Sequence, residues 1–336
     1  MNASSSDTLF LLGGCDSSGT TLVASVLDGL HDLRTGPESW LFHHRSLFTA
    51  DDFPRTLYGL LNNGGPAISM VVDKLRVSLQ PGGFFPPREA YGFGTVDDEY
   101  DLWRGSPALE GFIAAVLSRR RGAGGGPVAW IDQTPANAIS AREYLTRFPR
   151  RGRFIHVLRD GRDVVSSLVR RWTREAPDHP RDTYLVGGAV NWSWDVSQAL
   201  RAQDLPGYLE VRYEAFVRDP VGQTNRILQH LGRPAVDEAT FQANRARSRQ
   251  RQMQWGDKPS WGATPDQPIT DRSVGRWQLE IGVDLAKQLE NIRFTIAEEG
   301  GRSYCFGDVL QATGYRTLSR SDREPWPNTS SSIGTR

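Results

Sequence analysis

Two stretches of this chain combine glycine, hydroxyl and arginine residues at spacings that suit the binding of phosphate groups. The first is the loop Gly14-Cys-Asp-Ser-Ser-Gly-Thr-Thr21, in which four residues separate Gly14 from Gly19. A glycine-framed loop that leads into a helix points backbone N–H groups at an anion. The lysine that follows the second glycine in nucleotide triphosphatases is replaced here, since Thr20 and Thr21 follow Gly19. The loop is therefore predicted to bind a phosphate group, but not Mg-ATP in the usual way.

The second stretch is Arg159-Asp-Gly-Arg-Asp-Val-Val-Ser-Ser-Leu168. Ser167 lies eight residues after Arg159, which is about two helical turns. A turn and a helix start between them would let the two side chains converge on one phosphate. Arginine suits this role because its planar guanidinium stays charged and binds phosphate oxygens in pairs. Asp163 is expected to cap or brace the start of the helix.

The sequence around both stretches predicts alternating strands and helices. The strands expected at Leu9–Leu12 and Arg153–Leu158 each lead into one of them, and apolar residues recur at helical spacing from Thr20 to Leu30. Further strands are expected at 128–131 and 208–211, and further helices at 137–148, 184–204, 220–233 and 284–299. This order predicts a three-layer α/β fold of the P-loop NTPase-like kind, with a mostly parallel sheet and helices on both faces. Ligands bind such sheets at the carboxyl ends of the strands, where both stretches fall.

Length and composition limit the class of protein. The chain has 336 residues, of which 38% are apolar, enough for a sizeable core. We expect one domain over 1–317, with an insertion rich in glycine, proline and aromatic residues at about 79–106, and a disordered tail over 318–336. Forty basic residues against 39 acidic ones give a net charge of +1, which argues against a general binder of nucleic acid or anionic membranes.

The two cysteines, Cys15 and Cys305, indicate no disulfide framework. We interpret Cys15 as a small loop residue, and a redox or nucleophilic role is the less favoured alternative. We find no cluster with metal-ligand spacing, so no metal is predicted. No apolar run is long enough for a signal peptide or a membrane span, which predicts a cytoplasmic protein.

The two motifs together resemble those of the sulfotransferases that use 3′-phosphoadenosine 5′-phosphosulfate (PAPS). They read Gly-x-x-x-Ser-Gly-Thr-Thr near the N-terminus and Arg-Asp-x-Arg-Asp-x-x-x-Ser in mid-chain. Further matches, over roughly residues 8–300, are Thr134-Pro135, Tyr213-Glu214 and Gly275-Arg276-Trp277. The resemblance is greatest to the bacterial and tyrosylprotein-type branches, because of Gly36-Pro37-Glu38.

The resemblance implies a role for each matched position. In the family the first loop holds the 5′-phosphosulfate, the second element holds the 3′-phosphate, the Tyr-Glu element lies near the adenine, and a late basic loop covers the 3′-phosphate. The residues expected to bind PAPS, with no metal, are Gly14, Ser17, Ser18, Gly19, Thr20, Thr21, Arg159, Ser167, Tyr213 and Arg276.

The candidate general base is Glu38. It lies beyond the first helix, at about the offset where tyrosylprotein-type relatives place their catalytic glutamate. A pocket can raise the pKa of a carboxylate toward neutrality, which suits proton abstraction. The cytosolic branch uses histidine instead, so His31, His43 and His44 are alternatives. The non-catalytic alternative is that Glu38 is an acid in a surface turn or the partner in an ion pair.

Two positions depart from the family pattern. Ser17 and Gln133 stand where many relatives carry a cation near the sulfonate or its leaving phosphate. Lys258, Arg276 and Lys74 are candidates to supply the missing charge.

The expected function is transfer of the sulfonyl group from PAPS to a hydroxyl or amine of a small molecule, carbohydrate or peptide. The alternative is a non-catalytic nucleotide-binding protein that retains the sulfotransferase fold. A third hypothesis, an atypical P-loop kinase, is disfavoured because Gly19 is not followed by lysine. Nucleic acid and membranes are not expected as partners, and the sequence does not indicate the oligomeric state.

Overall fold

The computed structural model describes residues 8–35, 38, 42–51, 109, 129–253, 268–296 and 300–318. The insertion expected at about 79–106, the tail 319–336, and the candidate cations Lys74 and Lys258 lie outside these residues. The predicted domain limits, 1–317, therefore stay a prediction.

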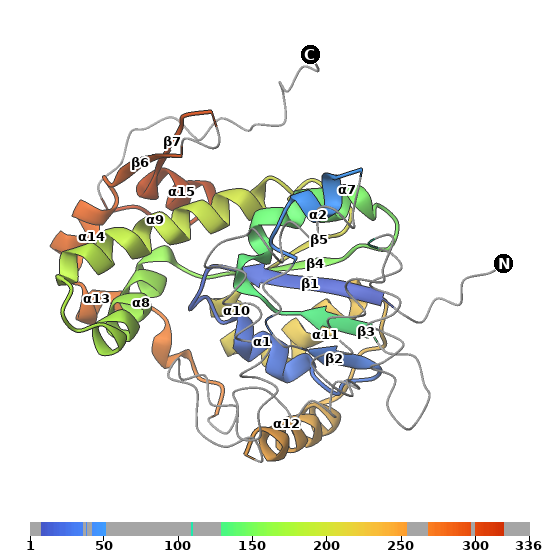
Figure 1. Cartoon of the computed structure of the whole chain (residues 1–336). Coiled ribbons are helices and arrows are strands. Elements are labelled where there is room, and N and C mark those ends of the chain that lie inside the picture. The colour runs from blue at the N-terminus through green and yellow to red at the C-terminus, as the bar shows by residue number, and fades with distance from the viewer. Residues whose placement is uncertain are drawn as a thin grey trace.

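A five-stranded parallel sheet forms the centre of the molecule (Figure 1). Its strands are β1 (Thr8–Gly14), β2 (Leu33–Thr35), β3 (Ala129–Asp132), β4 (Phe154–Leu158) and β5 (Tyr208–Arg212). They lie in the order β2-β3-β1-β4-β5, and every neighbouring pair is parallel. The predicted α/β fold with a mostly parallel sheet is confirmed.

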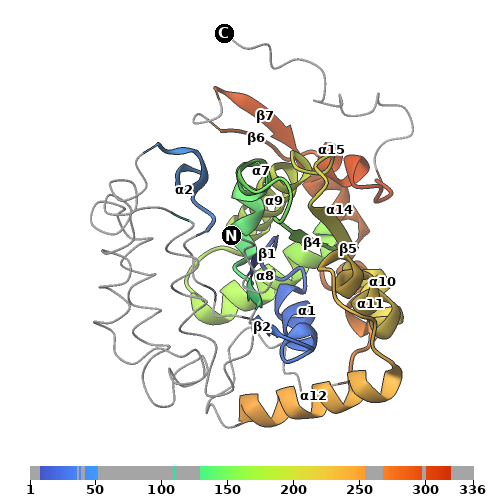
Figure 2. The same ribbon diagram turned by 90° about the vertical axis from the view of Figure 1, so that its right-hand side faces the viewer.

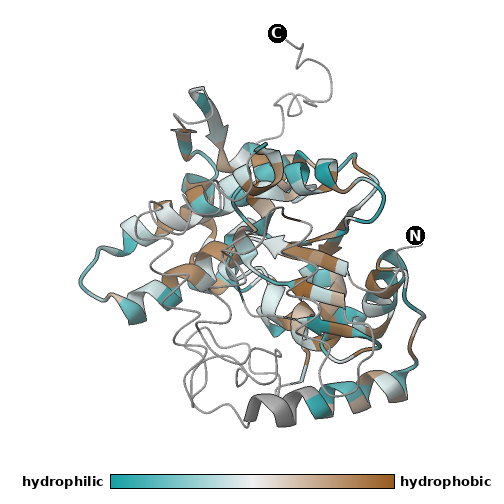
Figure 3. Cartoon of the chain, turned by 45° about the vertical axis from the view of Figure 1, so that its right-hand side comes forward, coloured by the Kyte–Doolittle hydropathy of each residue, from teal (hydrophilic) through white to brown (hydrophobic). Residues whose placement is uncertain are grey.

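Helices cover both faces of this sheet, and β1 shows why. Successive side chains of a strand point to opposite faces. Phe10 and Leu12 belong to the core on the side of helices α1 and α11, whereas Leu9 and Leu11 belong to the core on the side of α7 and α9. The four helices are α1 (Thr20–Leu27), α7 (Ala141–Arg147), α9 (Arg181–Leu200) and α11 (Pro220–His230). Figure 3 shows the hydrophobic colour concentrated on the strands and on the sides of the helices that face them.

The other elements lie around this three-layer centre. They are α2 (Ser46–Thr49), η2 (Pro135–Ser140), α8 (Gly161–Glu175), α10 (Tyr213–Arg218), α12 (Glu238–Met253), η3 (Asp271–Ser273), α13 (Trp277–Glu280), α14 (Val283–Leu289), β6 (Arg293–Ile296), β7 (Arg302–Cys305) and α15 (Phe306–Ala312). Figure 2 shows α12 along one edge of the molecule, beyond α1 and α11. No helix in the described ranges is both long and apolar enough to cross a bilayer.

The prediction of a single helix over 284–299 is wrong in its second half. The helix α14 ends at Leu289, and Arg293–Ile296 pairs with β7 as an antiparallel hairpin. The rings of Phe294 and Tyr304 stack across this pair, with centroids 5.3 Å apart. Aromatic and β-branched residues favour such pairing, so tertiary contacts overrode the local helical pattern.

A buried histidine in the sheet leads to a prediction about pH. His156 in β4 is fully buried against the Tyr208 hydroxyl, and burial lowers its pKa to about 3. The unfolded chain then binds more protons below pH 6.5, so the free energy of unfolding should fall as the pH drops from about 6.5 toward 4. The expected slope is about 1.4 kcal/mol per pH unit. His230, whose pKa is lowered to about 4 by burial, adds to the loss with the same sign.

Urea unfolding at several pH values measures this slope. The variant His156→Gln should show a flatter pH dependence than the parent, whatever its absolute stability. The exposed His179 offers a matched control, and His179→Gln should leave the slope unchanged. Parallel pH profiles for the parent and His156→Gln would contradict the prediction.

Candidate active site

The two predicted phosphate-binding stretches meet because the strands that precede them are neighbours. β1 pairs with β4, and Gly14 lies opposite Val157 in their register. The loop after β1 and the turn after β4, which begins at Arg159, therefore lie side by side at the carboxyl edge of the sheet (Figure 1). The strand order reverses at this point, which is where ligands bind in open α/β sheets.

The loop after β1 has the backbone of an anion-binding turn. Ser17 and Gly19 have left-handed backbones, with φ of 66° and 102°. The first turn of α1 begins at Thr20 without any side-chain cap, so its N–H groups are not occupied by a capping side chain. The buried hydroxyl of Ser18 has no hydrogen-bond partner in the structure. These features fit a ligand that brings acceptor oxygens.

Arg159 joins this loop to distant parts of the chain. Its Nη1 donates to the backbone oxygen of Ser17 at 3.0 Å, and its Nη2 donates to that of Ser273 at 2.6 Å. The guanidinium carbon lies 4.5 Å from the centre of the Tyr213 ring. The Nε atom is buried and has no hydrogen-bond partner among the described residues. Three of the predicted site residues, Ser17, Arg159 and Tyr213, are thus in one place.

The Tyr213-Glu214 pair, at the end of β5, supports both stretches. The Tyr213 ring packs against Gly19, and Glu214 accepts a hydrogen bond from the backbone N–H of Asp160 at 2.9 Å. The second carboxylate oxygen of Glu214 accepts from the Tyr315 hydroxyl at 3.0 Å. This pair therefore fixes the turn that carries Arg159.

The close approach of Tyr213 makes Gly19 sensitive to substitution. A Cβ on Gly19 would lie 2.5 Å from Cδ2 of the Tyr213 ring, at a φ that side chains disfavour. We expect Gly19→Ala to lower the free energy of unfolding by about 2–4 kcal/mol. Gly232 also has a positive φ, but a Cβ there would meet nothing within 4 Å. Gly232→Ala should cost only about 1 kcal/mol, and equal losses in denaturant unfolding would contradict the steric argument.

Asp163 holds the Gly-Arg-Trp segment rather than the start of its own helix. The residue that caps α8 is Asp160, whose side chain accepts from the N–H of Arg162. Asp163 instead accepts from the N–H groups of Gly275 at 2.8 Å and Trp277 at 3.0 Å. This distant contact had no signal in the sequence, because 112 residues separate Asp163 from Gly275.

Arg162 reinforces the same attachment. Its guanidinium lies 4.4 Å from the centre of the Trp277 ring and forms ion pairs with Asp160 at 2.7 Å and Glu290 at 3.5 Å. The segment around Trp277 is therefore fastened to the N-terminal part of α8, next to Arg159.

Arg276 and Ser166 both contact one carboxylate, that of Glu280. Arg276 pairs with Glu280 at 2.7 Å, and Arg170 pairs with the same side chain at 3.0 Å. The hydroxyl of Ser166 also bonds to Glu280, and the half-buried Ser167 follows it on α8. Prediction from the sequence therefore did not identify the group of charged and polar side chains beside the predicted site, which consists of Ser166, Arg170 and Glu280.

The candidate bases occupy different positions. Glu38 is half-buried, three residues beyond the end of β2 at the carboxyl edge of the sheet. His31 lies between the end of α1 and the start of β2, where its Nε2 bonds to the Pro234 carbonyl, so it is at the opposite edge. His43 and His44 lie with their ring centres 3.9 Å apart, and burial lowers the pKa of His44.

Cys15 is fully buried in the loop, and its thiol hydrogen-bonds to Asp195. Burial, followed by the nearby Asp195 carboxyl, raises the pKa of this thiol well above its ordinary value. A protonated thiol is a poor nucleophile, which favours a packing role for Cys15. Within the part of the chain that the structure describes, no three potential metal ligands lie together.

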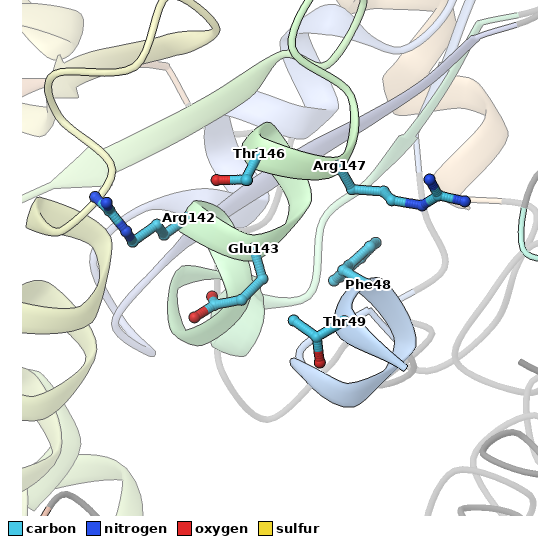
Figure 4. A pocket seen from close by; sticks show the side chains of 6 residues that line it. All are labelled: Phe48, Thr49, Arg142, Glu143, Thr146 and Arg147. Atoms are coloured by element: carbon cyan, nitrogen blue, oxygen red, sulfur yellow. The ribbon is translucent and has the colours of Figure 1, made fainter. Parts of the chain in front are cut away.

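A cavity of about 430 Å³ lies elsewhere, between α2 and α7 (Figure 4). Its lining residues are Phe48, Thr49, Arg142, Glu143, Thr146 and Arg147. Figure 4 shows Arg142 and Arg147 pointing to opposite sides of α7. None of the predicted site residues lines this cavity, so we do not include it in the candidate site.

Comparisons with known proteins identify the family of this chain. The model of the sulfotransferase family matches residues 10–238, about two thirds of the chain. The chain therefore belongs to the sulfotransferase family.

Two curated relatives are the omega-hydroxy-beta-dihydromenaquinone-9 sulfotransferases Stf3 of Mycobacterium bovis and Mycobacterium tuberculosis. Each is 26% identical to this chain over 142 residues, covering 40% of this chain and 34% of the relative. The chain thus spans about a third of the length of the curated relatives it matches.

Solved structures show similarity of fold. The sulfotransferase domain of the Synechococcus PCC 7002 olefin synthase is 19% identical, with a TM-score of 0.50, covering 79% of this chain and 86% of that domain. The mouse sulfotransferase SULT7A1, solved with PAP, is 12% identical with a TM-score of 0.44, covering 84% of this chain and 82% of its own.

Proposed function

We propose that this chain transfers the sulfonyl group of PAPS to a hydroxyl or amine of a small molecule, carbohydrate or peptide. The observation that supports this most is the meeting of the loop after β1 with Arg159, whose Nη1 lies 3.0 Å from the Ser17 carbonyl oxygen. The hydroxyl of Ser18 and the Nε of Arg159 are both buried without a partner in the part of the chain that the structure describes. Leaving such groups unpaired is costly, so a ligand that accepts hydrogen bonds fits there.

The two ends of the donor would be held by different elements. The backbone N–H groups of the loop, with Ser18, Thr20 and Thr21, would bind the 5′-phosphosulfate. Arg159 and Ser167 would bind the 3′-phosphate, with Arg276 near it. Tyr213 packs between Gly19 and Arg159 and would lie beside the adenine. Holding both ends aligns the sulfur with the acceptor, and such positioning contributes about 7–11 kcal/mol in favourable cases.

In the proposed step Glu38 takes the proton of the acceptor. The acceptor oxygen or nitrogen forms a bond to sulfur while the bond from sulfur to the bridging phosphate oxygen breaks. The electron pair of that bond leaves with adenosine 3′,5′-bisphosphate. A general base in this position contributes about 10²–10⁴-fold to the rate.

The second candidate function is nucleotide binding without catalysis. Ser17 and the half-buried Gln133 favour it, because neither position supplies a cation. The cytoplasmic location, and the lack of nucleic-acid or membrane partners, stay predictions from the sequence.

Calorimetric titration with adenosine 3′,5′-bisphosphate is the first test, followed by incubation with ³⁵S-labelled PAPS and a panel of acceptors. The panel should contain phenols, amines, sugars, peptides and a hydroxylated menaquinone, the acceptor class in the names of the mycobacterial relatives. Binding with transfer supports the proposal. Binding without transfer to any acceptor favours the second function, and no binding rejects both. Preferential binding of Mg-ATP would restore the kinase hypothesis.

A further inference from the structure

The loop after β1 lacks the charge that sulfonyl transfer needs. Negative charge develops on the bridging phosphate oxygen as the bond to sulfur breaks, and a fixed cation there lowers the barrier. Ser17 and Gln133 stand where such a cation would be expected, and neither can carry one. The structure describes a cation that reaches this loop from another element.

That cation is Arg171 in α8. Its Nη2 lies 3.0 Å from the Oδ2 of Asp16, the residue directly before Ser17. The side chain of Arg171 is 15% exposed, and its Nε is buried with no hydrogen-bond partner within the described ranges. The pair with Asp16 therefore leaves N–H donors of the guanidinium available to a ligand.

The position of Arg171 along α8 places it beside the proposed donor site. Residues four apart lie on the same side of a helix, so Arg171 is one turn beyond Ser167. The loop, Ser167 and Arg171 are then three parts of one surface, with Asp16 joining the loop to the helix.

Asp16 has an acidic neighbour of its own, Asp195. Asp195 lies close by and bonds to the Cys15 thiol, but burial, followed by the Asp16 carboxylate, raises its pKa well above the ordinary value. Among the described residues, Asp16 is the carboxylate that pairs with Arg171. Of the other candidate cations, Arg276 is likewise ion-paired, with Glu280, and Arg159, which also contacts the loop, is assigned to the 3′-phosphate.

We propose that Arg171, held in place by Asp16, supplies the positive charge at the sulfonate end of the donor that the loop itself lacks. This inference rests on the proposed function. It assigns Asp16 the part of a positioning residue, because Asp16 acts through Arg171. The competing explanation is that the pair only braces the loop against α8.

The test compares two quantities for each variant: the affinity for adenosine 3′,5′-bisphosphate, which has no sulfonate, and the rate of ³⁵S release from saturating PAPS. Arg171→Gln should lower the rate by about 10²–10³-fold and change the bisphosphate affinity by less than about threefold. Arg171→Lys, which keeps the charge, should stay within about tenfold of the parent rate. Arg174→Gln is the matched control, an exposed arginine three residues further along α8, and should match the parent.

A rescue distinguishes a catalytic charge from a brace. Ser17→Arg in the Arg171→Gln background returns a cation to the loop and should recover the rate at least about tenfold. Parallel loss of rate and bisphosphate affinity, with no rescue, would show a brace and overturn the inference. An unchanged rate in Arg171→Gln would also overturn it.

The outcome stays decisive if Arg171→Gln does not fold. Asp16→Asn keeps the arginine but removes its ion pair, so the rate should fall about tenfold with the bisphosphate affinity unchanged, and a parent-like rate would overturn the inference. A parent protein that binds no bisphosphate, or releases no ³⁵S, would reject the proposed function itself. An active parent with an equally active Arg171→Gln variant would reject only the role of Arg171.

Discussion

Replacing Arg159 with glutamine is expected to weaken the binding of adenosine 3′,5′-bisphosphate by about 10²–10³-fold. The guanidinium lies between the loop, the Ser273 carbonyl and the Tyr213 ring, where it can meet a phosphate with charge-assisted hydrogen bonds. Each such bond contributes about 1.5–3 kcal/mol, and glutamine supplies neither the charge nor the fork of donors. Calorimetric titration measures the loss directly.

Two further variants control this experiment. Arg159→Lys keeps a point charge but cannot bind two oxygens at once, so its affinity should lie between those of the parent and Arg159→Gln. Arg218→Gln removes an exposed arginine at the end of α10 and should leave the affinity unchanged. A bisphosphate affinity of Arg159→Gln within threefold of the parent would remove Arg159 from the donor site.

The second large effect is expected for Glu38→Gln, which should lower sulfonyl transfer by about 10²–10⁴-fold while leaving bisphosphate binding intact. The amide keeps the shape of the side chain but cannot accept the proton of the acceptor. The measurement is the rate of ³⁵S transfer at saturating PAPS, together with the bisphosphate affinity of the same preparation. Loss of rate alone identifies a base, whereas loss of both would indicate a damaged fold.

Histidine variants separate Glu38 from its alternatives. His31 lies at the far edge of the sheet, so His31→Gln should transfer at the parent rate. The pair His43 and His44 follows β2 along the chain, as Glu38 does. If Glu38→Gln kept the parent rate of sulfonyl transfer and His44→Gln lost it, His44 rather than Glu38 would be the general base. The exposed Glu238 supplies a control, since Glu238→Gln removes an acid far from the loop.

Much of the fold could be predicted because its signals are local. The strands at Leu9–Leu12 and Arg153–Leu158, and the helix that follows the glycine loop, appear in the structure close to their expected limits. Alternation of side chains along a strand and the 3.6-residue helical period are properties of neighbouring residues. The helix prediction failed at 293–296 because it relied on local signals alone, and that segment forms a strand through its pairing with β7.

The sequence alone determined which residue types stand at the ends of β1 and β4, namely the loop from Gly14 to Gly19 and the pair Arg159 and Ser167. Their spacing depends on local backbone geometry, which short stretches encode. The tertiary structure decided which distant groups meet them. Asp163 reaches Gly275 across 112 residues, and Asp16 reaches Arg171 across 155. Such contacts follow from strand order and helix packing, which bring together segments that carry no local sign of each other.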